Sequence, residues 1–124
     1  MKQPSRLWLL AVAENKVDGY ASTEMIQELC FHLLRRTADR RRAARESAEI
    51  ARTLHLLPFD ARVLDRALSL LPDVQVGARD CVHAATALSY GIEAIVTSDK
   101  AFDSVPGLRR IDPTVPPSSV EDKR

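Results

Sequence analysis

The sequence predicts an α/β domain with a short, mainly parallel sheet flanked by helices. Short apolar runs of the buried-strand kind alternate with longer segments in which apolar residues recur at helical spacing. Neither an internal repeat nor a linker divides the 124 residues, of which 45% are hydrophobic. This length and composition fit one globular domain, which we expect over residues 1–113. Paired prolines, serines and mixed charge predict a disordered tail over 114–124.

The first half of the sequence predicts three helices and one brief strand. A helix over 5–15 is followed by an Asp-Gly turn signal and then by a strand over 20–22. Ser22 or Thr23 can cap the second helix, since both side chains accept hydrogen bonds from free helical amides. The third helix follows an arginine-rich segment and continues to about Thr53.

The second half predicts three more strands and two more helices. A short strand over 54–59 ends near a proline, and Asp60 can cap the next helix. An alanine-rich helix is expected over about 78–90, followed by a buried strand over 94–97 and a weaker strand over 108–111. In parallel sheets ligands gather beyond the carboxyl ends of the strands, so functional residues are sought there.

Two helices carry distinctive packing faces. The small residues Ala84, Ala85 and Ala87 permit close packing of the alanine-rich helix. The two cysteines lack the short paired spacings of zinc ribbons and redox dithiols, so both are expected to be buried thiols. In the second helix, an apolar stripe at helical spacing is expected to be buried: Met25, Ile26, Leu29, Cys30 and Leu33.

Charge is balanced overall but not locally. Eighteen basic and 17 acidic residues give a net charge of +1, which provides no global attraction for nucleic acid. From Arg35 to Arg45, however, six arginines stand against Asp39 alone. This segment is either a solvated helix face or, with Arg40, Arg41 and Arg42, a surface that contacts RNA phosphates. A helical DNA-binding module that uses the same arginines is a third possibility.

No segment predicts export or membrane insertion. The N-terminal apolar run, Leu7 to Leu10, is shorter than the roughly seven residues of a signal-peptide core. No stretch approaches the roughly 18 apolar residues of a membrane span. We therefore expect a cytoplasmic protein without membrane contacts.

Three carboxylates stand where an α/β sheet would place chemistry: Glu28, Asp80 and Asp99. Carboxylates that converge repel one another unless a divalent cation neutralises them, and hard oxygen ligands favour Mg²⁺ or Mn²⁺. Each also has a simpler explanation. Asp80 can complement a helix dipole, Asp99 can cap a turn, and Glu28 can pair with His32 or Arg35 on its own helix.

The sequence around these acids resembles a known family. The runs 78–88, 95–103 and 110–113 look like the C-terminal half of a PIN domain, and 22–29 looks like the segment that carries the family's helical glutamate. The resemblance covers about 5–113 and is most specific between residues 79 and 102. The most similar subgroup is the VapC-like toxins of bacterial toxin-antitoxin pairs.

This resemblance implies a three-layer PIN-like fold and a magnesium-dependent endoribonuclease that a partner antitoxin blocks, with a homodimer as the expected assembly. It places Glu28, Asp80 and Asp99 at catalytic, metal-holding positions and Asp103 at an accessory metal position. These residues would bind one or two Mg²⁺, or Mn²⁺, for hydrolysis of RNA. The alternative is a catalytically impaired PIN-fold protein that mainly binds an antitoxin or dimer partner.

The same resemblance implies that the chain is truncated at its N-terminus. PIN domains open with a central strand that ends in an aspartate, and here the sequence starts at what resembles the first helix. The strands over 20–22 and 94–97 would then either pair directly or leave an unpaired gap, which predicts marginal stability.

Other polar and aromatic residues have two interpretations. His83, one turn beyond Asp80, could contact a scissile phosphate, but a packing or hydrogen-bonding role is favoured. Thr97 and Ser98 could orient Asp99 or cap a turn. Trp8 and Phe31 are expected to be packing residues rather than stacking platforms for bases.

Overall fold

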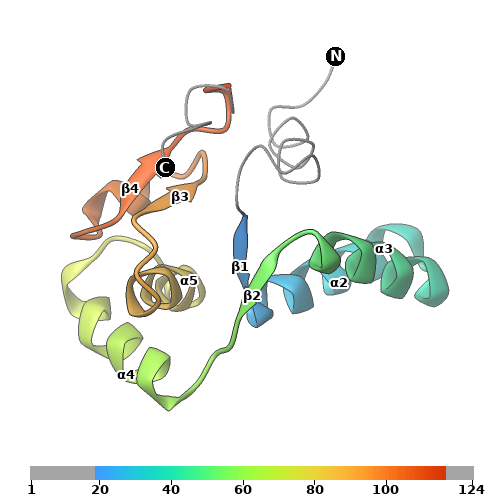
Figure 1. Cartoon of the computed structure of the whole chain (residues 1–124), viewed down its shortest axis with the longest axis horizontal. Helices are drawn as coiled ribbons and strands as arrows, with labels where there is room; N and C mark the ends of the chain where they lie inside the picture. The colour runs from blue at the N-terminus through green and yellow to red at the C-terminus, as the bar shows by residue number, and fades with distance from the viewer. Residues whose placement is uncertain (1–18, 117–124) are drawn as a thin grey trace.

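The structure is a computed structural model that describes residues 19–116. The helix expected over 5–15, with Trp8, lies outside these residues, as does most of the tail expected over 114–124. Helices and short strands alternate as expected (Figure 1). In chain order they are β1 (Tyr20–Ser22), α2 (Thr23–Thr37), α3 (Arg40–Arg52), β2 (His55–Leu57), α4 (Ala61–Leu70), the 3₁₀ turn η1 (Leu71–Asp73), α5 (Ala78–Ser89), β3 (Ala94–Val96), the 3₁₀ turn η2 (Lys100–Ser104) and β4 (Arg109–Ile111).

The strands form two parallel pairs. β1 pairs with β2, with Tyr20 opposite His55, and β3 pairs with β4, with Ala94 opposite Arg109. The expected parallel sense is therefore confirmed. The single continuous sheet is not seen among residues 19–116, where β1 and β3 do not pair. Each of these two strands has one neighbour in that range, and the unpaired gap expected between them stays a prediction.

Helices α2 and α4 begin at side-chain caps. Ser22 Oγ accepts a hydrogen bond from the Met25 amide (3.0 Å), and Asp60 Oδ1 accepts one from the Val63 amide (3.0 Å). Both predicted caps are confirmed. α2 ends at Ala38, whose positive φ of 53° reverses the chain before α3. No helix within residues 19–116 combines the length and apolarity needed to cross a membrane.

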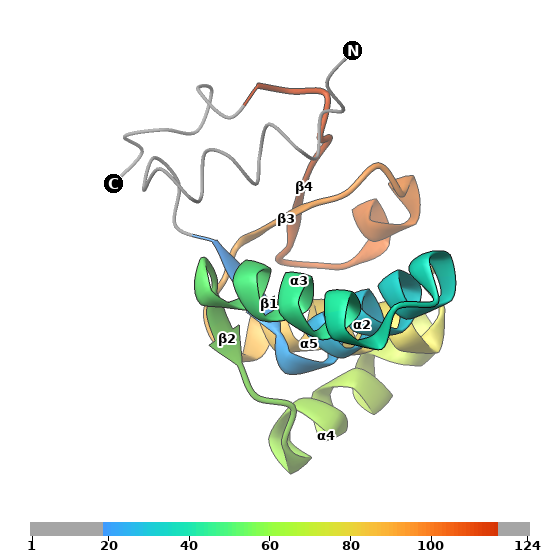
Figure 2. The same ribbon diagram turned by 90° about the vertical axis from the view of Figure 1, so that its right-hand side faces the viewer.

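The core surrounds α5. In Figure 1 this helix is seen nearly end-on, with α4 below it and the β3–β4 pair above it, and Figure 2 shows the same layers from the side. Cys81 and the alanine stripe are buried, as the sequence predicts. Cys81 Sγ donates to the Ala67 carbonyl of α4 at 3.3 Å, so the two helices approach closely. The buried apolar cluster comprises Val63, Ala67, Val76, Cys81, Ala84, Ala85, Ala87, Phe102, Val105 and Leu108.

α2 departs from the expectation of a buried stripe. None of its residues is buried, and Met25 is 39% exposed. The physical reason is its packing: α2 and α3 form a hairpin that extends away from the core, so α3 covers only one side of α2 (Figures 1 and 2). Phe31 is 56% exposed, with the Arg35 guanidinium 5.6 Å from its ring centre, so the packing role expected for it is wrong.

The two cysteines differ in their burial. Cys81 is buried, and this burial raises the pKa of its thiol, whereas Cys30 is only partly buried. Since alkylation requires an accessible thiolate, iodoacetamide is expected to label Cys30 of the native protein well before Cys81. Mass spectrometry of a labelling time course checks this. Equal labelling rates in the native protein, with both sites reacting at once in denaturant, would contradict the assigned burial.

Candidate functional site

The three predicted carboxylates lie on three different elements. Glu28 is in the middle of α2, Asp80 is in the first turn of α5, and Asp99 follows β3 and caps η2. In the part of the chain that the structure describes, no three His, Cys, Asp or Glu side chains form a group that could hold a metal ion. The predicted acids are thus not assembled into a complete ligand set within residues 19–116, and their metal role stays a prediction.

Glu28 is bound to α5 and not to its own helix. Its Oε2 lies 3.3 Å from His83 Nε2 and 3.8 Å from Arg79 Nε. The pairing with His32 or Arg35 that the sequence allowed is therefore replaced by contacts between helices. Arg79 precedes Asp80 by one residue, and His83 follows it by three. Glu28 therefore contacts the same first turns of α5 that carry Asp80.

Asp80 is half-buried and makes no hydrogen bond or ion pair with any residue of the described region. Its position in the first turn of α5 places its negative charge near the positive end of the helix dipole. The helix cap before it is Gly77, which has no side chain to satisfy the first amides. The dipole explanation is consistent with this geometry, and the carboxylate keeps its oxygens available for another partner.

Asp99 organises the turn after β3. Its Oδ1 accepts a hydrogen bond from the Ala101 amide at 2.9 Å, and its own amide donates to Thr97 Oγ1 at 3.1 Å. The capping role that the sequence allowed is confirmed, and Thr97 does orient the backbone of Asp99. One carboxylate oxygen, Oδ2, makes no contact within residues 19–116.

Asp103, the predicted accessory ligand, pairs with an arginine. Its Oδ1 accepts from Arg110 Nε at 3.0 Å. Arg110 Nη1 also donates to the Thr97 carbonyl (3.3 Å) and to Asp112 Oδ2 (3.4 Å). The Arg110 side chain is only 15% exposed, and it ties η2, β4 and the end of β3 together. In this structure Asp103 therefore stabilises the loop that carries Asp99.

Asp112 contributes stability that depends on pH. Hydrogen bonds from the Thr114 amide and hydroxyl, together with Arg110, lower the pKa of its carboxyl. A lowered folded-state pKa stabilises the protein above the unfolded value of about 3.9, and the contribution is lost as pH falls through the folded value. Asp112→Asn is expected to lower the urea midpoint at pH 7, with a smaller difference from wild type at pH 3. A difference that is constant across this range would contradict the assignment.

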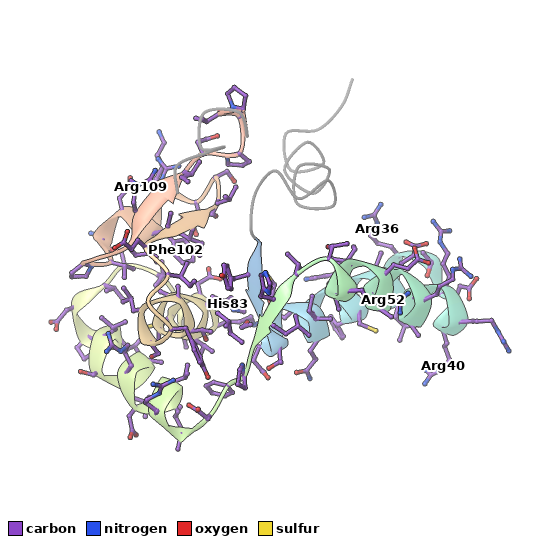
Figure 3. All side chains as sticks on the ribbon, viewed as in Figure 1. Arg36, Arg40, Arg52, His83, Phe102 and Arg109 are labelled. Carbon is purple, nitrogen blue, oxygen red and sulfur yellow. The ribbon has the colours of Figure 1, made fainter. Side chains whose placement is uncertain are left out.

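His83 has a hydrogen-bonding role. It is 8% exposed, and its Nδ1 lies 3.1 Å from Ser22 Oγ while its Nε2 faces Glu28. Figure 3 shows His83 beside β1, between the core and the hairpin. The favoured sequence interpretation is confirmed, but its partners were missed because they lie 61 and 55 positions earlier in the chain.

The donor chemistry of the three acids fits a hard divalent cation. Glu28 approaches His83 and Arg79 through Oε2, and its Oε1 accepts no hydrogen bond within residues 19–116. Asp80 has no partner in that range, and Asp99 Oδ2 has none either. Mg²⁺ binds a few carboxylate oxygens and keeps several waters, so these oxygens are of the chemical type that it prefers, while within residues 19–116 they do not form a group that could hold the ion.

The arginine-rich segment lies on the α2–α3 hairpin. Arg40, Arg41 and Arg42 are exposed, and Figure 3 shows Arg40 pointing away from the hairpin. Arg42 Nε is 2.6 Å from Glu46 Oε2, one helical turn later. Arg40 and Arg41 make no ion pair with a described residue. Among the residues that the structure describes, the segment is thus partly a self-paired helix face and partly a basic surface without acidic partners.

Comparison with known proteins identifies the family. The PIN domain family matches residues 3–108. Ribonuclease VapC13 of Mycobacterium tuberculosis and a VapC ribonuclease of Mycobacterium bovis are each 32% identical over 116 residues, covering 87% of this chain and 86% of the relative.

Solved structures show the same fold. A DNA-bound VapBC from Salmonella typhimurium superimposes with a TM-score of 0.72 and 19% identity, covering 90% of this chain and 86% of the other. A toxin-antitoxin complex from Klebsiella pneumoniae gives 0.67 and 17%, covering 91% and 86%. One conclusion follows from these similarities, and it agrees with the helix order, the parallel strands and the positions of the acids on α2, on α5 and in the loop after β3. This chain belongs to the PIN-domain family and is a relative of its VapC ribonucleases.

Proposed function

We propose that this protein is a magnesium-dependent endoribonuclease and the toxin component of a VapBC-type toxin-antitoxin system, acting in the cytoplasm. Relatives of 32% identity named as VapC ribonucleases support the ribonuclease activity. The observation that carries the proposal is the half-buried Asp80 carboxylate, which has no hydrogen bond or ion pair within residues 19–116 and lies on the turns of α5 that Glu28 contacts. A half-buried carboxylate that no described residue neutralises is available to a cation.

Glu28, Asp80 and Asp99 are the residues that would hold Mg²⁺, with Mn²⁺ as the alternative ion and Asp103 as an accessory ligand. When bound, the cation supplies activation of water and neutralises charge that develops on the phosphodiester. The chain's own contribution is to hold the carboxylates in place. Glu28 is held by α5, and Asp99 is held by its hydrogen bonds within the turn after β3.

The activity is tested with purified protein and a labelled single-stranded RNA. Cleavage is expected in millimolar Mg²⁺, is expected to stop in excess EDTA, and is expected to return when Mg²⁺ is restored. Mn²⁺ is expected to substitute. Cleavage that persists in EDTA would refute the metal dependence, and no cleavage of any RNA tested in Mg²⁺ would favour the impaired PIN-fold protein instead.

Arg40 and Arg41 are the residues that we propose contact RNA most strongly, with Arg42 contributing less because Glu46 already neutralises it. Removing one arginine–phosphate interaction changes the slope of log affinity against log salt by about 0.7 for a single strand. The double variant Arg40→Ala/Arg41→Ala is therefore expected to flatten this slope by about 1 to 1.5. Fluorescence anisotropy at several salt concentrations measures it.

A matched control is Arg66→Ala on α4, because Arg66 is also exposed but lies outside the hairpin. Its salt slope is expected to equal that of the wild type. If the double variant and this control behave alike, the arginine-rich segment is only a solvated face.

We propose that the cognate antitoxin and a second copy of this chain are the protein partners. The structural relatives include toxin-antitoxin complexes, which supports the first of these. Exposed leucines at helical spacing on α4 and its end support a protein-binding face: Leu64, Leu68 and Leu71. The alternative function, in which binding to a partner is retained and cleavage is impaired, requires such a face as well.

A further inference from the structure

The contact between α2 and α5 contains a series of three polar side chains, two of them buried. Ser22 Oγ lies 3.1 Å from His83 Nδ1, and His83 Nε2 lies 3.3 Å from Glu28 Oε2. Ser22 is 4% exposed and His83 is 8% exposed, so water does not substitute for these partners. We call these three residues the Ser22–His83–Glu28 link.

The direction of each hydrogen bond follows from the number of protons available. Ser22 Oγ already accepts from the Met25 amide at 3.0 Å, so its own hydroxyl proton can be donated to His83 Nδ1. Nδ1 is then an acceptor, and the ring proton is on Nε2, which lies 3.3 Å from the Glu28 carboxylate. The opposite tautomer would direct the Nε2 lone pair at a carboxylate oxygen, which is repulsive. If the ring carries both protons, a protonated Nε2 still faces Glu28.

The link acts on one oxygen of Glu28 and leaves the other to a ligand. Both His83 and Arg79 contact Oε2, but Arg79 is 75% exposed and 3.8 Å away, so His83 is the stronger constraint. A glutamate side chain has several rotatable bonds, and ordering it reduces the affinity of a metal site. Groups that hydrogen-bond a metal-holding carboxylate remove that cost in advance.

We propose that His83, oriented by Ser22, is a positioning residue that holds Glu28 in the conformation that binds the divalent cation. This inference rests on the proposed metal-dependent function. It assigns no direct contact between His83 and RNA, and it explains why an imidazole stands on the alanine-rich buried face of α5.

Two substitutions separate the nitrogens of the ring. His83→Asn places an amide near Nδ1, so it keeps the contact with Ser22 and removes the donor to Glu28. His83→Gln places an amide nitrogen near Nε2, so it keeps the donor to Glu28. Isothermal titration calorimetry with Mg²⁺ alone is expected to show about tenfold weaker binding for His83→Asn, in the 10- to 100-fold range typical of such partners. His83→Gln is expected to restore most of the affinity.

A second pair of variants tests Ser22 and controls for helix capping. Ser22→Ala removes both the proton donor to His83 and the cap of α2, and is expected to weaken Mg²⁺ binding, whereas Ser22→Thr keeps both. Asp60→Ala removes an equivalent cap from α4 without touching the link, and is expected to bind Mg²⁺ as the wild type does. Thermal midpoints of all variants report the effects of capping separately.

The outcomes distinguish this inference from the proposed function. A wild type that neither binds Mg²⁺ nor cleaves RNA refutes the metal-dependent function, and the positioning role falls with it. If the wild type binds and cleaves while folded His83→Asn binds Mg²⁺ equally well, only the positioning role is refuted. Equally weakened binding in His83→Asn and His83→Gln also refutes it, because the position of the donor would then not matter.

NMR of the ring nitrogens is expected to show a proton on Nε2 in the metal-free protein, and a neutral ring protonated on Nδ1 instead would refute the orientation.

Discussion

Asp80→Asn is expected to reduce magnesium-dependent RNA cleavage by about 100-fold or more, since even a residue that only supports a ligand typically contributes 10- to 100-fold. The substitution keeps the size of the side chain and removes its charge. Because Asp80 makes no hydrogen bond or ion pair within residues 19–116, the fold is expected to remain intact. Cleavage rates are measured in saturating Mg²⁺ on one RNA substrate.

Thermal unfolding of the same variant separates metal binding from stability. A ligand that binds only the folded state raises its stability by mass action, so Mg²⁺ is expected to raise the wild-type midpoint but not that of Asp80→Asn. Asp65→Asn is the control, because Asp65 is exposed on α4, away from the predicted acids. Wild-type cleavage by Asp80→Asn would remove this residue from the site.

Ala84→Leu is expected to produce a large loss of stability. Ala84 is fully buried and lies one turn from Cys81, which touches α4 through the Ala67 carbonyl. Three added carbons cannot be accommodated without separating α4 from α5. Overpacking of this kind typically costs about 1 to 3 kcal/mol, against a total stability of about 5 to 15 kcal/mol. Urea denaturation followed by circular dichroism measures the change.

Ala44→Leu makes the same chemical change on the exposed side of α3. Its effect is expected to lie within about 0.5 kcal/mol of the wild type, because a surface side chain has space to move. If both variants have the same urea midpoint, the close contact between α4 and α5 is not as the structure describes it.

Local sequence patterns determined the elements. Ser22 and Asp60 were predicted as caps because a short polar side chain before a periodic segment can bond the free amides, a rule that needs no tertiary contact. The capping role of Asp99 was foreseen as an alternative for the same reason. The alanine stripe of α5 likewise predicted close packing, because small side chains on one face allow a neighbouring helix to approach.

The small extent to which α2 is buried could not be predicted in this way. Apolar periodicity shows which face of a helix is available for packing, but not how much of that face a neighbour covers. α3 covers one side, while Phe31 stays 56% exposed, because the hairpin extends from the core. The division of the strands into two pairs is also a tertiary result, since a short apolar run does not specify its partner.

The sequence by itself determined the family resemblance, the choice of Glu28, Asp80 and Asp99 as candidate site residues, and the helix caps, because each depends on residue type and local spacing. The tertiary structure alone decided that Glu28 contacts His83 and not its helical neighbours, and that Asp103 pairs with Arg110. The physical reason is that a buried polar group is satisfied by whichever partner the packing brings within about 3 Å, and packing joins residues far apart in the chain.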